Sequence, residues 1–211
     1  GRLTDRVTSF GTSAILTEVP EMFGAETLLM QRCKNRETFD KCVDMINSFK
    51  QYFFSHNQEC YENPSPGNHD GGITTLEEKS LGCIQKGGKA IITDILKYGE
   101  HCKKPGLSLL TGPGNDIVSV TNLTAAGANI ILFTTGRGTP LGAPVPTVKI
   151  SSNSFLYKRK SNWIDFNAGE LINNRDFENI TEEILNLVIE VASGKKTKNE
   201  INSTFPYLKT E

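Results

Sequence analysis

The sequence predicts an α/β fold in which helices cover both faces of a mostly parallel sheet. Short segments that are apolar throughout alternate with longer segments in which apolar residues recur every three or four positions. Strands that are buried on both faces have continuous apolar runs, and the longer period is typical of packed helices. A chain of 211 residues can form a sizeable core without disulfide bonds. We therefore expect a single α/β domain over residues 1–211.

The expected elements of the first half follow from this pattern. Residues 3–7 resemble the middle of an amphipathic helix, and residues 12–17 form a short apolar strand. Residues 36–56 carry the apolar stripe of a long packed helix. Residues 57–72 lack periodicity, as expected of a loop, and the next helix runs to Gln85. Two overlapping capping-box patterns mark its start, Thr74 with Glu77 and Thr75 with Glu78.

The second half continues the alternation of strands and helices. Strands are expected at residues 90–95, 107–111, 129–134 and 147–151. Helices are expected at residues 117–126 and from Asn179, as the N-cap, to the stop at Gly194. The polar tail, residues 195–211, is expected to be loosely held.

Composition and charge exclude several classes of protein. The formal net charge is −1 and no dense cationic face is visible, so nucleic acid is not an expected partner. The longest apolar run has four residues, 130–133, which is too short to span a membrane. The cysteines are odd in number and contain no C-x-x-C pair, which indicates reduced thiols and a cytoplasmic protein.

Two glycine-rich loops lack the G-x-G-x-x-G spacing of a dinucleotide-binding site. The pair Gly112 and Gly114 lacks the third glycine because Ile117 stands there, and the pair Gly136 and Gly138 lacks it because of Leu141. Both spacings fail. A nucleotide-binding module therefore remains only an alternative.

Charged residues are expected to collect at the carboxyl ends of the strands, where open parallel sheets bind ligands. Those residues are Glu18, Asp94, Asp116 and Arg137. Glu18, Glu21 and Glu26 also cluster just past the first strand, and their oxygens suit Mn²⁺, Mg²⁺ or Fe²⁺. The alternative is a solvated acidic turn before a helix.

Two loops could hold an anion. Residues 63–72 offer amides, hydroxyls and backbone N–H groups before a helix N-terminus, an arrangement that binds carboxylates. Arg137 lies between two glycines and can hold a carboxylate in a bidentate manner. The alternatives are an ordered proline-rich connection and an ordinary surface arginine.

Several motifs together resemble the altronate and galactarate dehydratase family over nearly the whole chain. The resemblance rests on TEVPEMFGAE at residues 17–26, NPSPGN at 63–68, GGITTLEEKSLG at 71–82, FTTGRG at 133–138, Lys149-Ile150, NAG at 167–169 and ASG at 192–194. The long block from residue 63 to 82 is highly specific. Family members are longer, so the chain is similar to their C-terminal catalytic part, a Rossmann-like sheet. The upstream β-clip domain and Cys-Gly-Gly-Ser-Asp segment would then precede Gly1.

The resemblance implies a hydro-lyase that acts on a sugar acid and needs Fe²⁺ or Mn²⁺. D-altronate, converted to 2-dehydro-3-deoxy-D-gluconate, is the expected substrate, with D-galactarate as the alternative. The reaction removes the proton α to a carboxylate and expels the 3-hydroxyl, with metal assistance. A homodimer is expected for the full-length protein.

The site residues are assigned on the matching motifs. Glu18 and Glu21 would bind the metal or its waters, and Glu18 would also be catalytic. Lys79 is expected to act as the base or as the carboxylate anchor, since a partly buried lysine can have a lowered pKa. The expected substrate contacts are Ser65, Asn68, Thr134, Thr135 and Arg137. A non-catalytic structural domain, supporting a site completed elsewhere, remains a further alternative.

Overall fold

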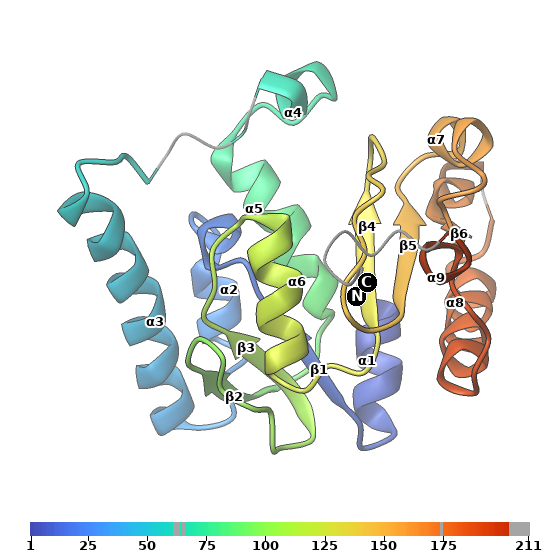
Figure 1. The fold of residues 1–211 in the computed structure, drawn as a ribbon. Helices are drawn as coiled ribbons and strands as arrows, with labels where there is room; N and C mark the ends of the chain where they lie inside the picture. The colour runs from blue at the N-terminus through green and yellow to red at the C-terminus, as the bar shows by residue number, and fades with distance from the viewer. Residues whose placement is uncertain (61–63, 65, 174, 203–211) are drawn as a thin grey trace, which may run out of the picture. The chain divides into compact units, whose positions relative to one another are not determined.

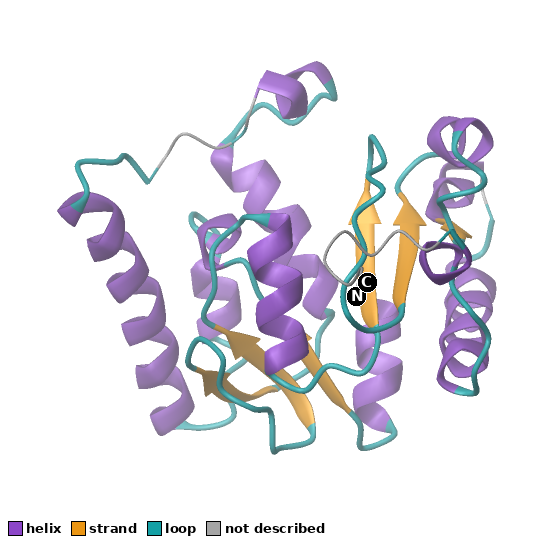
Figure 2. Ribbon diagram, in the orientation of Figure 1, coloured by secondary structure: helices purple, strands orange, loops and turns teal. Residues whose placement is uncertain are grey.

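The computed structural model describes residues 1–60, 64, 66–173 and 175–202. The chain divides into two compact units, residues 1–126 and 127–211. Each unit contains a three-stranded parallel sheet flanked by helices (Figures 1 and 2). The predicted α/β class and the parallel pairing are confirmed, although the strands form two sheets rather than one. The expectation of a single domain stays a prediction.

The first unit has its strands in the order β1-β3-β2. Ser13 pairs with Gly106, and Leu16 with Leu109. The elements of this unit are α1 Arg2–Ser9, β1 Ser13–Leu16, η1 Val19–Met22, α2 Glu26–Met30, α3 Arg36–Ser55, α4 Pro66–Asp70, α5 Leu76–Ile84, η2 Gln85–Gly87, β2 Ile92–Leu96, β3 Gly106–Leu110 and α6 Asp116–Ala125. Every strand and long helix expected in this half is present, within two residues at each end, and the short helix α4 lies inside the expected 57–72 loop.

Two apolar clusters lie on the faces of this sheet. One cluster packs Leu107 and Leu109 of β3 against Leu29 of α2 and Ile46 of α3. The other packs Leu96 and Leu110 against Ala126, with Leu123 of α6 beside them. Helices therefore cover both faces of the β1-β3-β2 sheet, as the continuous apolar strands predict.

Local capping signals fix the start of α5. The Thr75 side chain accepts a hydrogen bond from the backbone N–H of Glu78, and the Glu78 carboxylate accepts one from the Thr75 N–H. The second of the two predicted capping boxes is thus the one that forms. Thr74 adds a hydrogen bond to the same carboxylate through its backbone N–H, 2.8 Å long.

The second unit has its strands in the order β4-β5-β6. Val148 and Ile150 of the central strand pack against Ile184, Leu187 and Val191 of the last long helix. The elements of this unit are β4 Ile131–Thr135, β5 Thr147–Ser151, α7 Ser154–Arg159, β6 Phe166–Asn167, η3 Ala168–Asn173, α8 Phe177–Ala192 and α9 Lys198–Ile201.

Two expectations for the second unit are wrong. The N-cap of α8 is Asp176, whose carboxylate accepts from the Asn179 N–H, so Asn179 lies inside the first turn. The tail is not loosely held between residues 195 and 201, and its residues 203–211 lie outside the described part of the chain. Thr197 caps α9 in a capping box with Glu200, and Asn199 is buried. A short capped helix is easily missed because it lacks an apolar repeat.

Gly169 is a position where a side chain cannot fit. A Cβ atom there would lie 2.3 Å from the backbone nitrogen of Ser154. Gly169→Ala is expected to lower the free energy of unfolding by about 3 kcal/mol, because backbone must move to relieve the overlap. Chemical denaturation measures this loss. Gly82→Ala is the control, because nothing lies within 4 Å of the added Cβ in α5. A Gly169→Ala protein as stable as the native protein would contradict the close approach of Gly169 to Ser154.

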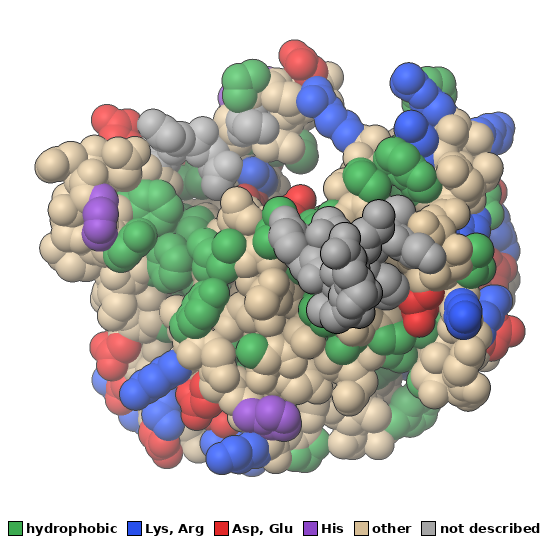
Figure 3. Space-filling view, viewed as in Figure 1, with side chains coloured by type: hydrophobic (Ala, Val, Ile, Leu, Met, Phe, Trp, Pro, Cys, Tyr) green, Lys and Arg blue, Asp and Glu red, His purple; other side chains and the backbone are tan. Residues whose placement is uncertain are grey.

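The surface of α3 carries apolar side chains. Tyr52 and Phe54 are more than half exposed, and the space-filling view shows hydrophobic side chains gathered over α3 (Figure 3). No helix in the described part of the chain is both long enough and apolar enough to cross a membrane.

Candidate functional site

Glu18 lies directly past the carboxyl end of β1, in a backbone conformation that is unusual for its residue type. Its φ of 71° and ψ of 63° are in the left-handed region, which costs energy for a residue with a side chain. Two hydrogen bonds hold its neighbours: Thr17 Oγ1 donates to the Leu110 carbonyl at 3.0 Å, and the Val19 N–H donates to the Gly112 carbonyl at 3.0 Å. Such strain persists only where surrounding contacts enforce it, and it collects at functional sites.

The Glu18 carboxyl group has a strongly perturbed pKa. Burial raises it from the ordinary 4.5 to about 7, and the carboxylates of Glu21 and Asp116 add to the rise. Lys86 and Lys79 oppose it. A carboxyl group that changes protonation near neutral pH is suited to accept and return a proton.

Lys79 and Glu21 form an ion pair beside Glu18. Lys79 Nζ lies 3.1 Å from Glu21 Oε2, and both side chains are less than one-fifth exposed. The short helix η1, which carries Glu21, packs directly against α5, which carries Lys79. We call Glu18, Glu21, Lys79 and Lys86 the strand-end cluster. The structure thus brings together the three residues of this unit that were predicted as catalytic or metal-binding.

Lys86 is the member that sequence reasoning missed. Lys79, Cys83 and Lys86 are spaced by four and then three residues, which places them on one face of α5 and its extension η2. Burial raises the pKa of the Cys83 thiol to about 11, so this cysteine is a poor nucleophile. The i, i+4, i+7 spacing was the signal that could have found Lys86.

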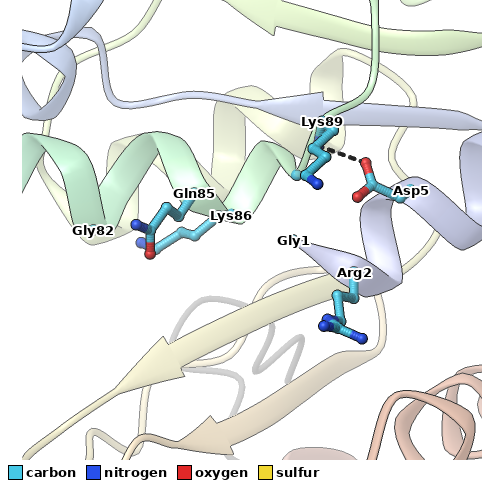
Figure 4. Close-up of a pocket in the computed structure, with 8 residues that line it drawn as sticks. Gly1, Arg2, Asp5, Gly82, Gln85, Lys86 and Lys89 are labelled. Atoms are coloured by element: carbon cyan, nitrogen blue, oxygen red, sulfur yellow. Dashed lines mark hydrogen bonds between the residues drawn. The ribbon is translucent and has the colours of Figure 1, made fainter. Parts of the chain in front are cut away.

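A hollow of about 460 Å³ opens beside Lys86. Its lining residues are Gly1, Arg2, Asp5, Gly82, Gln85, Lys86, Gly88 and Lys89. Figure 4 shows Gln85 and Lys86 side by side on η2, and the Asp5 carboxylate accepting from the Lys89 backbone N–H. Three cationic side chains and one carboxylate line this hollow, which favours an anion over a neutral molecule.

Glu26 does not join the strand-end cluster, contrary to the expectation from sequence. Its carboxylate pairs with Lys50 of α3 and accepts from the Gly24 N–H. Burial opposes ionisation, but the hydrogen bonds from Lys50 and the backbone outweigh it and lower the pKa of Glu26. This carboxylate therefore stabilises the fold.

Glu26→Gln is expected to lower the free energy of unfolding by about 1 kcal/mol at pH 7. Because the folded-state pKa is depressed, the contribution is present above pH 4.5 and is lost as the pH falls through the folded-state value. Urea unfolding at pH 7 and pH 3 measures the effect, and the difference between the two proteins should be smaller at pH 3. Glu37→Gln is the control, because its ion pair with Lys41 is exposed. A loss equal to that of the control would contradict the role of Glu26.

The second unit carries Thr134, Thr135 and Arg137 at the carboxyl end of β4. Thr135 Oγ1 accepts from the Gly138 N–H at 2.9 Å, and Asn153 Nδ2 donates to the Gly136 carbonyl at 3.0 Å. Gly138 has a φ of +83°, which only glycine adopts without strain. The arginine is exposed on a turn that is fixed on both sides.

Other predicted site residues have different outcomes. Asn68 lies in the short helix α4, where its carbonyl accepts from the N–H groups of Gly71 and Ile73. Ser65 lies outside the described residues. Asp94 does not lie past the end of a strand: it is inside β2 and pairs with Lys104 at 3.0 Å.

The predicted metal ligands do not form a metal site by themselves. Burial keeps Glu18 protonated up to about pH 7, and Glu21 is engaged by Lys79. In the ranges that the structure describes, no group of three or more His, Cys, Asp or Glu side chains could hold a metal ion. Two carboxylates supply only part of the oxygen ligands that Mn²⁺ or Mg²⁺ takes.

Comparison with known proteins shows the family of this chain. The family model described as D-galactarate/altronate dehydratase, C-terminal, matches residues 1–208. The chain belongs to this family. The resemblance predicted from the motifs is therefore confirmed.

Characterised relatives of the dehydratase family are much longer. An altronate dehydratase of Bacillus subtilis is 57% identical over 203 residues, which are 96% of this chain and 41% of the relative. An altronate dehydratase of Escherichia coli is 55% identical, with the same coverage. The galactarate dehydratase (L-threo-forming) of Escherichia coli is 33% identical over 93% of this chain and 38% of its own length. The chain thus spans about two-fifths of these relatives.

Proposed function

We propose that this chain is the C-terminal catalytic part of a sugar-acid hydro-lyase that converts D-altronate to 2-dehydro-3-deoxy-D-gluconate. The observation that carries the proposal is Glu18, a strained and largely buried carboxyl group with a pKa near 7 among two lysines. The relatives named altronate dehydratase share more of this sequence than the galactarate dehydratase does, which supports D-altronate over D-galactarate.

The chemistry assigned to Glu18 is proton transfer. Dehydration removes the C2 proton, expels the C3 hydroxyl as water and leaves an enol, which becomes the 2-keto acid when C3 takes up a proton. Glu18 in its carboxylate form takes the C2 proton, and the protonated carboxyl group then gives a proton to the departing hydroxyl. A pKa near the working pH makes both halves of this exchange accessible.

The cationic side chains would stabilise negative charge on the substrate rather than transfer protons. Removing the C2 proton spreads negative charge onto the substrate carboxylate, and fixed positive charge nearby stabilises it. Lys79 donates to Glu21, so the geometry favours the carboxylate anchor over the base among its two predicted roles. Lys86 extends the positive charge into the adjoining hollow. Arg137, Thr134 and Thr135, with Ser65 and Asn68, stay predicted contacts of the sugar acid.

The remaining expectations concern the full-length protein. A requirement for Fe²⁺ or Mn²⁺ stays a prediction, and its ligands would have to extend beyond Glu18 and Glu21. Metal content and recovery of activity after chelation test it. A homodimer, a cytoplasmic location and the absence of a nucleic-acid partner also stay predictions.

Turnover of candidate substrates by the full-length protein tests the proposed function. We expect D-altronate to be dehydrated to a 2-keto acid, with D-galactarate a poorer substrate. The 2-keto acid is detected directly by its carbonyl chemistry. A melting-temperature increase with NAD, without turnover of either sugar acid, would overturn the proposal in favour of a nucleotide-binding module.

A further inference from the structure

Lys149 is a fully buried lysine that the mechanism above does not use. It lies on β5, the central strand of the second unit, and its relative exposure is 0%. A buried ammonium group is costly unless it is hydrogen-bonded, and an apolar side chain would fill the same space. The position of Lys149 therefore calls for an explanation beyond packing.

The Lys149 ammonium group reaches across to the loop that follows β4. Its Nζ donates to the Thr139 carbonyl at 2.6 Å and lies 5.4 Å from the centroid of the Phe133 ring. The two flanking residues of the strand, Val148 and Ile150, belong to the apolar cluster with α8. Because side chains alternate along a strand, Lys149 is on the opposite face.

A second buried side chain holds the next carbonyl of the same loop. Asn199 of α9 is 4% exposed, and its Nδ2 donates to the Pro140 carbonyl at 3.1 Å. Asp165 ties the two holding elements together, because its carboxylate accepts from the Lys149 N–H at 2.7 Å and from the Lys198 N–H at 2.8 Å. Two consecutive carbonyls are thus held from two separate elements.

We propose that Lys149 and Asn199 are positioning residues that fix the Thr135–Pro140 turn, residues 135–140, and thereby aim Arg137 at the carboxylate of the sugar acid. This inference rests on the proposed function for the role of Arg137. The start of the turn is fixed by Thr135 and Asn153, and the Lys149–Asn199 clamp fixes its end. Arg137 lies inside this turn, so a displaced turn would displace the guanidinium group from the geometry that bidentate binding needs.

The test uses Lys149→Met and Asn199→Leu in the full-length protein, with Lys149→Arg as the conservative variant. We expect KM for the sugar acid to rise about tenfold in the first two, the effect of one lost charge-assisted contact, with kcat changed less than about twofold. Lys149→Arg should restore most of the affinity. Thr147→Val is the matched control: it is buried on the same face of β5 but bonds the Ala143 N–H instead.

A double-variant cycle separates positioning from general structure. If Lys149 acts through Arg137, adding Lys149→Met to Arg137→Ala should raise KM no further. Trypsin cleavage after Arg137 gives a readout independent of activity, and it should be faster in Lys149→Met and Asn199→Leu than in Thr147→Val. KM increases that multiply in the double variant would overturn the clamp. Trypsin cleavage no faster than in Thr147→Val would also overturn it. An unchanged KM in Arg137→Ala alone would instead overturn the substrate role of Arg137, while cleavage still decides the clamp.

Discussion

Replacing Glu18 with Gln in the full-length protein is expected to lower kcat for sugar-acid dehydration by about a hundredfold to ten-thousandfold, the usual contribution of a general acid–base group. The amide has nearly the same shape as the carboxyl group but cannot take the C2 proton. In the native protein, kcat/KM should change with pH around 7, where burial and the neighbouring carboxylates place the pKa of Glu18. In the variant this change should disappear. A residual activity above one-tenth, with the same pH profile, would contradict the assignment.

The pH dependence of stability shows whether the Glu18→Gln variant loses activity because it unfolds. The folded-state pKa is raised from 4.5 to about 7, so the folded protein holds a proton that the unfolded chain releases in this window. Stability from this group is therefore present below pH 4.5 and is lost as the pH rises through 7. A glutamine side chain does not ionise, so the variant keeps this stability at high pH. It should be more stable than the native protein at pH 8 and equal to it at pH 4. An inactive but stabilised variant would show that the lost activity is not caused by unfolding.

Replacing Lys79 with Met is expected to lower kcat/KM by about a hundredfold, because a cation that stabilises the developing negative charge is removed. The substitution also leaves the Glu21 carboxylate without its ion-pair partner at a mostly buried position. Unfolding should therefore become easier by about 1–3 kcal/mol. Steady-state kinetics and urea unfolding measure the two effects.

The double variant Lys79→Met with Glu21→Gln separates catalysis from stability. Replacing the unpaired Glu21 carboxylate with a neutral amide should recover most of the stability, because an amide needs only neutral hydrogen bonds. Activity should stay low, since the cation is still missing. Recovery of activity together with stability would show that Lys79 has only a structural role.

The fold was predictable wherever the local signal was strong. The apolar runs identified β1 and β3, and the long stripe of α3 ends within one residue of the expected boundary. The capping pattern of Thr75 and Glu78 fixed the start of α5. What failed were short elements and the division into two sheets, because strand pairing depends on contacts between distant segments that no local pattern encodes.

The candidate site was predictable in its residues more than in its electrostatics. Glu18, Glu21 and Lys79, which were named on the motifs, lie close together in the structure, and their roles stay predictions. The raised pKa of Glu18 could not be read from the sequence, since it arises from burial and from the Asp116 and Glu21 carboxylates, which approach only in the folded chain. For the same reason the sequence could not show that Glu26 pairs with Lys50 rather than joining Glu18.

The most direct test of the account follows D-altronate by NMR in D₂O with the full-length protein and its Glu18→Gln variant. The native protein should release a 2-dehydro-3-deoxy acid with one deuterium at C3, because the enol takes its proton from solvent. The variant should bind the sugar acid with a similar Kd, measured by calorimetry, and form no product. Product formation by the variant at the native rate, or unchanged substrate with the native protein, would contradict the central claim.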